Sequence, residues 1–525
     1  MTNSSTTDRS PTTEATPAAT PTPAVTTRRA LLQAPWQRIA MIAAGAAGAS
    51  AVLAACDVVD APFDRSTHLA RRATFGATPD TIAAIAADEA GWLQAQLNPS
   101  TLDTTALDAK LASLPALSLT PTELMTTYPD NATSFEAGLQ LPVAWLIRAV
   151  ESPAQLFERM VEFWNDHFNV PTEARFSRLM KIAEDRLVMR THALGRFKDL
   201  LAGSASSPAM LDYLDNRFSI AGNPNENYAR ELLELHTMGV DGGYTEADIV
   251  NTARLLTGWS VIGPLGLFFF RVNQHDTSPL SIMGWNRPTD TDYLQHGFDF
   301  LDWLAMRPET ATFVCRKIAR RFVSDMPSQA IVDAMAATWL ANDSQIAPVL
   351  QTMFAHPDFD AAAGTKFNRP LDYMFARLRA VQADVQPITD ITILQPLAQL
   401  LGGLGQIPFQ WPAPNGYPDV EGAWRNTGGL LNRWNLVGDL LANNYPVISF
   451  DPTYLTAPLT GLTAPEIFDS LAMTLLQQPT TAAGRGLLLT QTAWSETTVP
   501  SQLELTEKLP LIVFILKASP DAMYR

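Results

Sequence analysis

One short polar segment carries the residues best suited to acid–base chemistry. A helix places Glu226, Arg230 and Glu234 in one stripe, because they recur every four residues. Asn227 and Glu231 lie beside that stripe. If the segment is partly buried, desolvation and neighbouring charges move the pKa values of two carboxyl groups apart and create an acid/base pair. If it faces water, the residues form ion pairs that contribute about a few tenths of a kcal/mol each, and spacing alone favours this interpretation.

His167 is the second candidate for acid–base chemistry. It continues an apolar stripe through Leu156 and Met160 of a predicted helix, so we expect it to face inward, with Asp166 on another face. An inward histidine is more often a hydrogen-bonded core residue than a catalyst. The polar context Trp-Asn-Asp-His-Phe keeps the catalytic interpretation open. In that interpretation His167 or Glu231 is the general acid or base, and Arg230 holds an anionic group or tunes a carboxylate.

Metal and nucleotide chemistry has little support in the sequence. His236 is a further ring that can serve as a metal ligand or an acid, but no His-x-x-x-His or Cys-x-x-Cys spacing accompanies it. The chain also lacks a Gly-x-Ser-x-Gly elbow, a P-loop and a His-Glu-x-x-His motif. We therefore predict no metal site, and the sequence leaves the question of a cofactor open.

The elements that position these residues are predicted to be helices, because helical periodicity dominates the chain. Helices are predicted over 78–97, 153–168, 225–238, 245–256, 308–323, 329–340, 346–354, 370–383 and 423–441. Asn225 can cap the helix that carries the polar stripe, and Gly239 can end it.

Strand signals are few. Residues 265–272 are the best candidate, as one arm of a hairpin beside an irregular loop that runs to Gln295. The proline-rich stretch 406–420 excludes a helix and indicates a rigid, turn-rich segment. The expected fold is all-α, a multi-helix, loop-rich globular domain over 63–525 with at most a small β-hairpin. Two lobes can meet near 263–295.

The start of the chain indicates export. Arg28 and Arg29 resemble a twin-arginine signal, and an uncharged Ala/Gly-rich run follows and ends at Cys56. That run is too weakly apolar for a permanent membrane span. We therefore expect residues 1–55 to be a signal peptide with a disordered start, Cys56 to be the lipid-attachment site, and 56–62 to be a tether. The twin-arginine translocase and a membrane bound through the lipid are the expected partners, with the protein at the periplasmic face of the inner membrane or at the cell surface.

The net charge argues against nucleic-acid binding, and the cysteine content limits disulfide bonding. The net charge is −16, and residues 1–55 hold more basic than acidic residues, so the part after them is more acidic still. Such a surface repels nucleic acid. If Cys56 carries lipid, Cys315 is the only other cysteine, and no intrachain disulfide can form.

Several sequence blocks resemble the bacterial family called domain of unknown function 1800. They cover nearly all of the part after the signal and comprise 69–76, 163–168, 208–215, 225–239, 244–249, 256–259, His275-Asp276, Arg369-Pro370, 414–419, Trp424 and 518–525. The resemblance implies an exported, largely helical bacterial protein without an established activity. It also implies an exported partner that resembles sulfatases and alkaline phosphatases. Because the likeness centres on polar residues, it favours His167 and the stripe as the site.

Three functions remain open from the sequence. The first is an exported enzyme that acts on an envelope polymer or glycan by acid–base chemistry. The second is a non-catalytic lipoprotein that scaffolds or matures a secreted partner through its Trp-rich loops. The third is a metal or cofactor protein, because twin-arginine export suits proteins that fold before transport.

Overall fold

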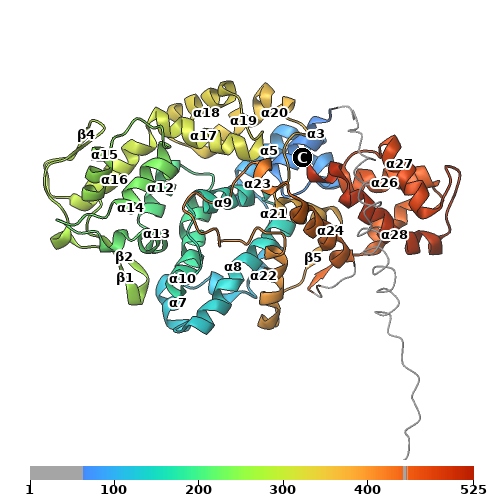
Figure 1. The fold of residues 1–525 in the computed structure, drawn as a ribbon, viewed down its shortest axis with the longest axis horizontal. Helices are drawn as coiled ribbons and strands as arrows, with labels where there is room; N and C mark the ends of the chain where they lie inside the picture. The colour runs from blue at the N-terminus through green and yellow to red at the C-terminus, as the bar shows by residue number, and fades with distance from the viewer. Residues whose placement is uncertain (1–62, 442–444, 446) are drawn as a thin grey trace, which may run out of the picture.

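The computed structural model describes residues 63–441, 445 and 447–525. The predicted export signal and tether, with Arg28, Arg29 and Cys56, lie outside these residues. The described chain is a multi-helix, all-α fold with three small two-stranded sheets, as predicted (Figure 1). None of its helices has both the length and the apolar character that a membrane span requires.

Two runs of helices make up the fold. The first comprises α3 (Arg65–Ala73), α4 (Pro79–Ala87), α5 (Glu89–Leu97), α6 (Thr105–Leu111), α7 (Pro121–Thr127), α8 (Asn131–Glu151), α9 (Gln155–His167), α10 (Arg175–Glu184), α11 (Arg190–His192), α12 (Phe197–Ala205) and α13 (Pro208–Tyr213). The second comprises α14 (Glu226–Glu231), α15 (Glu246–Leu255), α16 (Tyr293–Ala305), α17 (Pro308–Phe322), α18 (Gln329–Ala341), α19 (Ile346–Ala355), α20 (Pro357–Ala361), α21 (Pro370–Ala380), α22 (Leu394–Gly402), α23 (Glu421–Trp424), α24 (Thr427–Leu441), α25 (Pro452–Thr456), α26 (Ala464–Leu476), α27 (Ala482–Thr492) and α28 (Gln502–Ala518).

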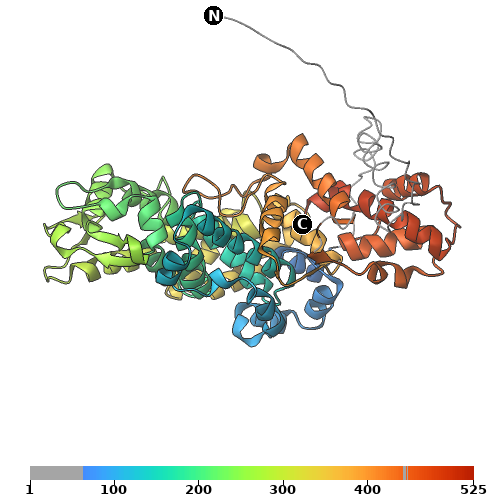
Figure 2. The same ribbon diagram turned by 90° about the horizontal axis from the view of Figure 1, so that it is seen from below.

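The helices are arranged along an elongated molecule. Helices α26, α27 and α28 lie at one end. Helices α14, α15 and α16 lie at the other, with the hairpin of β1 (Trp259–Ile262) and β2 (Leu267–Phe270) (Figures 1 and 2). Helix α9 lies in the middle (Figure 1). The residue that ends α9 is His167, so this candidate is placed at the centre of the molecule.

Three predicted helices are shorter or divided. Helix 78–97 breaks at Asp88, whose carboxylate accepts the N–H of Gly91 at 2.9 Å and caps a new helix. Helix 370–383 ends at Ala380, and Gln382 follows with a positive φ of 50°. Helix 423–441 divides at Asn426, whose side chain accepts the N–H of Gly429 at 2.8 Å. In each case a local side-chain or backbone conformation overrides the apolar period.

The predicted helix 225–238 changes its winding halfway. Asn225 caps it as expected, because its side chain accepts the N–H of Asn227 at 2.9 Å. After α14 the chain continues as a π-helix over Leu232–Thr237, and a second π-helix covers Asp185–Met189. Single π-helical turns are frequent at functional sites, and His236 lies in one.

The strands are short and antiparallel. β2 (Leu267–Phe270) pairs with β1 (Trp259–Ile262), which confirms the predicted hairpin arm. β3 (Ser281–Ile282) pairs with β4 (Trp285–Asn286), and β5 (Asp384–Val385) pairs with β6 (Ile448–Ser449). Residues 406–420 contain no helix, as expected.

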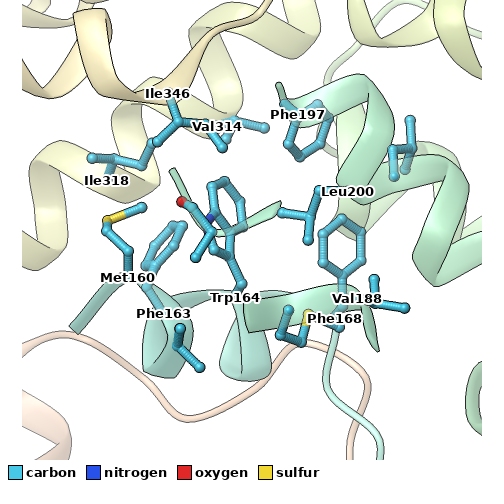
Figure 3. Packing of buried hydrophobic residues seen from close by; sticks show 14 of the residues in the cluster. Met160, Phe163, Trp164, Phe168, Val188, Phe197, Leu200, Val314, Ile318 and Ile346 are labelled. Atoms are coloured by element: carbon cyan, nitrogen blue, oxygen red, sulfur yellow. The ribbon is translucent and has the colours of Figure 1, made fainter. Parts of the chain in front are cut away.

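Two apolar clusters form the core. One extends from Leu69 to Ala362, and the other joins parts of the first helices to residues after 366. The division into two lobes near 263–295 stays a prediction. Trp164 lies in the middle of the first cluster, close to Met160, Phe168 and Phe197 (Figure 3), and its Nε1 donates to the carbonyl of Ala193 at 2.9 Å. Truncating such a ring typically costs about 3–5 kcal/mol, so α9 is held firmly.

Candidate active site

The polar stripe of α14 lies at the surface. The guanidinium of Arg230 pairs with Glu246 at 2.9 Å, with Glu226 at 3.5 Å and with Glu234 at 3.6 Å. The hydrogen bond with Glu246, together with the charges of Glu246 and Glu234, raises the pKa of the Arg230 guanidinium above its usual value. Exposed pairs of this kind contribute about 0–1 kcal/mol each. The stripe therefore has the character of a surface ion-pair ladder.

The other two residues of the segment lie apart from this ladder. Asn227 is exposed and donates its main-chain N–H to the cap residue Asn225. Glu231 is partly buried, and burial together with the nearby charge of Glu234 raises the pKa of its carboxyl. Among the described residues, no hydrogen bond joins the side chain of His167 to the side chain of Arg230 or Glu231.

The side chain of His167 is buried. Its Nε2 lies 3.0 Å from the main-chain carbonyl of His236, and because a carbonyl only accepts, Nε2 carries the proton. Its Nδ1 has no hydrogen-bond partner. Burial, and then the nearby charge of Lys317, hold the pKa of His167 well below its usual 6.5. The ring is therefore neutral at pH 7.

His167 forms part of the wall of a cavity of about 170 Å³. Three segments that are distant in the sequence line it: the end of α9, the last turns of α17, and the turn-rich stretch 406–420. The lining residues are Phe163, Asp166, His167, Lys317, Arg320, Arg321, Trp411, Asn415, Gly416, Tyr417, Pro418 and Asp419. Asp166 and His167 both line this cavity, although as adjacent residues they lie on different faces of α9. The helix ends at His167, and the turn-rich stretch covers that end.

The turn-rich stretch fits closely against α9. Gly416 has a φ of +69°, and a Cβ added there would overlap the carbonyl oxygen of Asp166. Asn169 donates to the carbonyls of Trp411 and Ala413, both at 2.8 Å. The rings of Trp411 and Tyr417 lie 4.9 Å apart between centroids. These contacts fix an aromatic wall above the cavity.

Behind the cavity lies a buried network of carboxylates and guanidinium groups. Arg321 donates to Glu162 at 2.7 Å, to Asp166 at 2.8 Å and to Asp419 through a third short contact. Arg369 also binds Glu162, at 2.6 Å, and Asp166, at 3.2 Å. Two arginines thus hold the same pair of acidic residues of α9 from α17 and from the start of α21.

The network continues away from the cavity through Asp372. Its carboxylate accepts from Arg369 at 3.0 Å, from Arg159 at 3.1 Å and from Arg525 at 3.2 Å. All four side chains are almost fully buried. Removing one member of a buried pair typically costs about 3–5 kcal/mol, because the other charge is left without compensation.

Two carboxylates on the cavity wall have pKa values shifted in opposite directions. Burial raises the pKa of Asp166 to about 6, against the lowering effect of Arg321, and its side chain keeps 19% exposure. Burial also acts to raise the pKa of Asp419, but Arg321, Arg369 and Lys366 outweigh it and hold that pKa well below its usual 3.8. Such divergence is typical of an acid/base pair.

Lys317 supplies a cation that the network does not neutralise. Its ammonium lies 5.7 Å from the centre of the Phe313 ring and pairs with no carboxylate among the described residues. Burial lowers its pKa to about 8, although the charge of Asp166 opposes that shift. Lys317 is therefore still mostly protonated at pH 7, next to a neutral His167.

Sequence reasoning missed most of this site. Asp166, Lys317, Arg321, Arg369 and Asp419 were not among the candidates. The charges of α17 carried no signal, because charged residues on an amphipathic helix normally face water. Asp166, Arg369 and Asp419 did lie within the blocks that resemble the family, and that resemblance was the available pointer to them.

A metal site is not apparent in the described part of the chain, where no three His, Cys, Asp or Glu side chains gather suitably. The fold and the site together define a helical protein with a buried acid–guanidinium network behind an aromatic-walled cavity. The chain belongs to the family described as Protein of unknown function (DUF1800), whose model matches residues 68–524. No curated protein and no solved structure matches the chain.

Proposed function

We propose that this protein is an exported, membrane-anchored enzyme that acts by acid–base chemistry on an anionic glycan or glycoconjugate of the cell envelope. The observation that carries this proposal is the presence of Asp166 and Lys317 in one cavity, with pKa values moved to about 6 and about 8. Perturbed groups that line one cavity are typical of catalytic sites.

Asp166 is the proposed general acid. A pKa of about 6 keeps a usable fraction of its carboxyl protonated near neutral pH, and its partial exposure lets it reach a ligand. Asp419 stays ionised on the same guanidinium, that of Arg321, and can stabilise positive charge that develops on a sugar ring. The two carboxylates therefore have distinct roles.

The cations and aromatic rings of the cavity indicate the kind of ligand. Lys317 and Arg320 line the cavity without a carboxylate partner among the described residues, so a ligand with a negative group compensates them. Trp411 and Tyr417 offer apolar ring faces with polar edges, which suits a sugar ring. An anionic saccharide unit satisfies both features.

The location of this activity rests on the sequence alone. The twin arginine at Arg28-Arg29 and the cysteine at Cys56 support export and lipid anchoring. A protein anchored there is positioned to act on a polymer of the cell envelope.

The experiment is a cleavage assay on isolated envelope glycans that carry carboxylate or phosphate groups, with fragments detected by mass spectrometry. We expect Asp166→Asn to lower turnover by about 100-fold or more. The matched control is Asp343→Asn, because that carboxylate lies on the surface with Arg196 and Lys198. Full activity in Asp166→Asn would show that the cavity is not the active site.

A second candidate function is a non-catalytic lipoprotein that binds an exported partner. An apolar surface around the hairpin β1–β2 favours it, because Phe218, Phe269 and Val272 are 58%, 48% and 55% exposed. Exposed apolar patches often mark interaction sites. Loss of a co-purifying exported protein from Phe269→Ser, with no glycan cleavage by the wild type, would favour this function over the enzyme.

A further inference from the structure

The amine of Lys317 is a nucleophile that glycan cleavage does not require. Lys317 belongs to α17 and forms part of the wall of the cavity of about 170 Å³. The residue is half-buried and keeps contact with solvent, and its Nζ has no hydrogen-bond partner among the described residues. A small molecule in the cavity can therefore reach this amine. Lysine amines in such positions form covalent bonds with carbonyl compounds.

The surroundings of Lys317 favour the uncharged, nucleophilic form of its amine. Arg320 and Arg321 lie one turn further along α17, so they extend from the same face of the helix. Burial lowers the pKa of Lys317 to about 8, and the charges of both arginines act in the same direction. The carboxylates of Asp166 and Asp419 oppose this shift. Roughly a tenth of such an amine is uncharged at pH 7, against roughly 0.04% for a lysine of ordinary pKa.

A proton donor lies close to this amine. Asp166 lines the same cavity from α9, and of the charged neighbours of Lys317 it acts most strongly on the ammonium. Arg321 holds the Asp166 carboxylate at 2.8 Å, while 19% exposure of that side chain leaves it open to a ligand. The condensation of an amine with a carbonyl group needs such a donor, because the carbonyl oxygen must leave as water.

Arg320 indicates the charge of the ligand. Its Nε donates to the main-chain carbonyl of Asp325 at 3.1 Å, and no carboxylate of the described residues pairs with it. Its other donors suit a carboxylate or phosphate group. At roughly 15 Å³ for each water-sized group, the cavity has room for about ten of them, which fits a small molecule.

We propose that Lys317 forms an imine with the aldehyde or ketone group of a small anionic molecule, whose negative group binds Arg320. The uncharged amine attacks the carbonyl carbon, a C–N bond forms, and a proton moves from the nitrogen to the carbonyl oxygen. The nitrogen lone pair then expels this hydroxyl as water, with a proton supplied by the carboxyl of Asp166, and a protonated imine remains. The sum is the condensation of an amine and a carbonyl group with loss of one water, so no oxidant or reductant takes part.

The test is reductive trapping of the full chain at pH 7 with glyoxylate, which is an anionic aldehyde, and cyanoborohydride. Reduction of the imine leaves carboxymethyl-lysine, which peptide mass spectrometry locates. The matched reference is Lys508 of α28, which is half-buried as well. We expect trapping at Lys317 to be at least about tenfold faster than at Lys508, and its rate to saturate with glyoxylate concentration.

Two variants complete the test. Lys317→Arg keeps the positive charge and should lose trapping at this position, because a guanidinium forms no imine here. Arg320→Gln should lower the rate of trapping at Lys317 by glyoxylate, relative to that by the uncharged aldehyde propanal, by about tenfold. If Arg320→Gln does not fold, acetate added to the wild type replaces it, because acetate should compete with glyoxylate for Arg320.

Two results would overturn the proposal. One is trapping at Lys317 of the wild type no faster than at Lys508. The other is an unchanged preference for glyoxylate over propanal in Arg320→Gln, or no slowing of glyoxylate trapping by acetate. Neither measurement involves glycan cleavage, so this site and the proposed function fail or hold independently.

Discussion

His167 donates a hydrogen bond from Nε2 to the main-chain carbonyl of His236, 3.0 Å away. This bond joins the end of α9 to the π-helical turn that follows α14. The two segments that carried the sequence candidates therefore meet, but through a backbone atom of His236. The side chain of Arg230 lies at the surface instead, where Glu246 binds it. The residues to which we assign acid–base roles in the proposed function lie on α9 and α17 and in the turn-rich stretch that covers them.

The close fit of the turn-rich stretch predicts a strong effect of Gly416→Ala. The added Cβ would overlap the carbonyl of Asp166, and the φ of +69° disfavours a side chain. We expect a loss of about 1–3 kcal/mol in the free energy of unfolding, measured in urea. Gly422→Ala is the control, because a Cβ at that position meets nothing within 4 Å. Equal stability of the two variants would show that the stretch does not hold this position.

The shifted pKa of Asp166 predicts a stability difference that depends on pH. Because the folded protein raises this pKa to about 6, the protonated carboxyl is favoured by folding. Its contribution is full below the unfolded pKa, about 3.9, and is lost as the pH rises through about 6. From pH 4 to pH 8 the wild type should lose about 1–3 kcal/mol relative to Asp166→Asn in urea unfolding. A constant difference over this range would mean that Asp166 titrates normally.

The buried network and the surface ladder predict opposite sensitivities to the loss of an arginine. Arg321→Gln leaves Glu162, Asp166 and Asp419 without their shared donor, so we expect a cost of about 3–5 kcal/mol. Arg230→Gln removes only exposed pairs and should cost less than about 1 kcal/mol. Chemical denaturation of both variants is the measurement. Similar costs for the two would contradict the assignment of the network to the core.

The contrast between these arginines shows what the sequence can predict. Periodicity gave most helices and the inward direction of His167, because apolar spacing is a local property. It could not give the break within 78–97, where the carboxylate of Asp88 caps a new helix. Nor could it give the partnership of Arg321 with Glu162, which are joined only by tertiary packing. A charge on an amphipathic helix is expected in water, and only the fold shows that this one is buried.

The predicted lipid anchor is tested in cells. Cys56→Ser should release the protein from the membrane fraction into the soluble periplasmic or medium fraction, because no acyl chain can be attached. Replacing Arg28 and Arg29 together by lysine should retain the chain in the cytoplasm, since the export receptor reads the arginine pair. Fractionation with immunoblotting measures both. Membrane retention of Cys56→Ser would exclude Cys56 as the anchor.

The burial of His236 predicts that acid lowers the stability of the fold. The ring is fully buried with neither nitrogen bonded, and burial lowers its pKa to about 3. A histidine with a depressed pKa contributes its stability above its unfolded pKa of about 6.5 and loses it as the pH falls below that value. His236→Phe, which keeps an aromatic ring among Phe168 and Tyr228, should therefore lose less stability on acidification. In urea unfolding, we expect the stability of His236→Phe relative to the wild type to be about 1–3 kcal/mol greater at pH 4.5 than at pH 7.5.

His192→Gln, at a partly exposed position, is the control and should change the pH dependence less. If His236→Phe and the wild type lost stability in parallel, the buried ring of His236 would be protonated as easily as a free histidine.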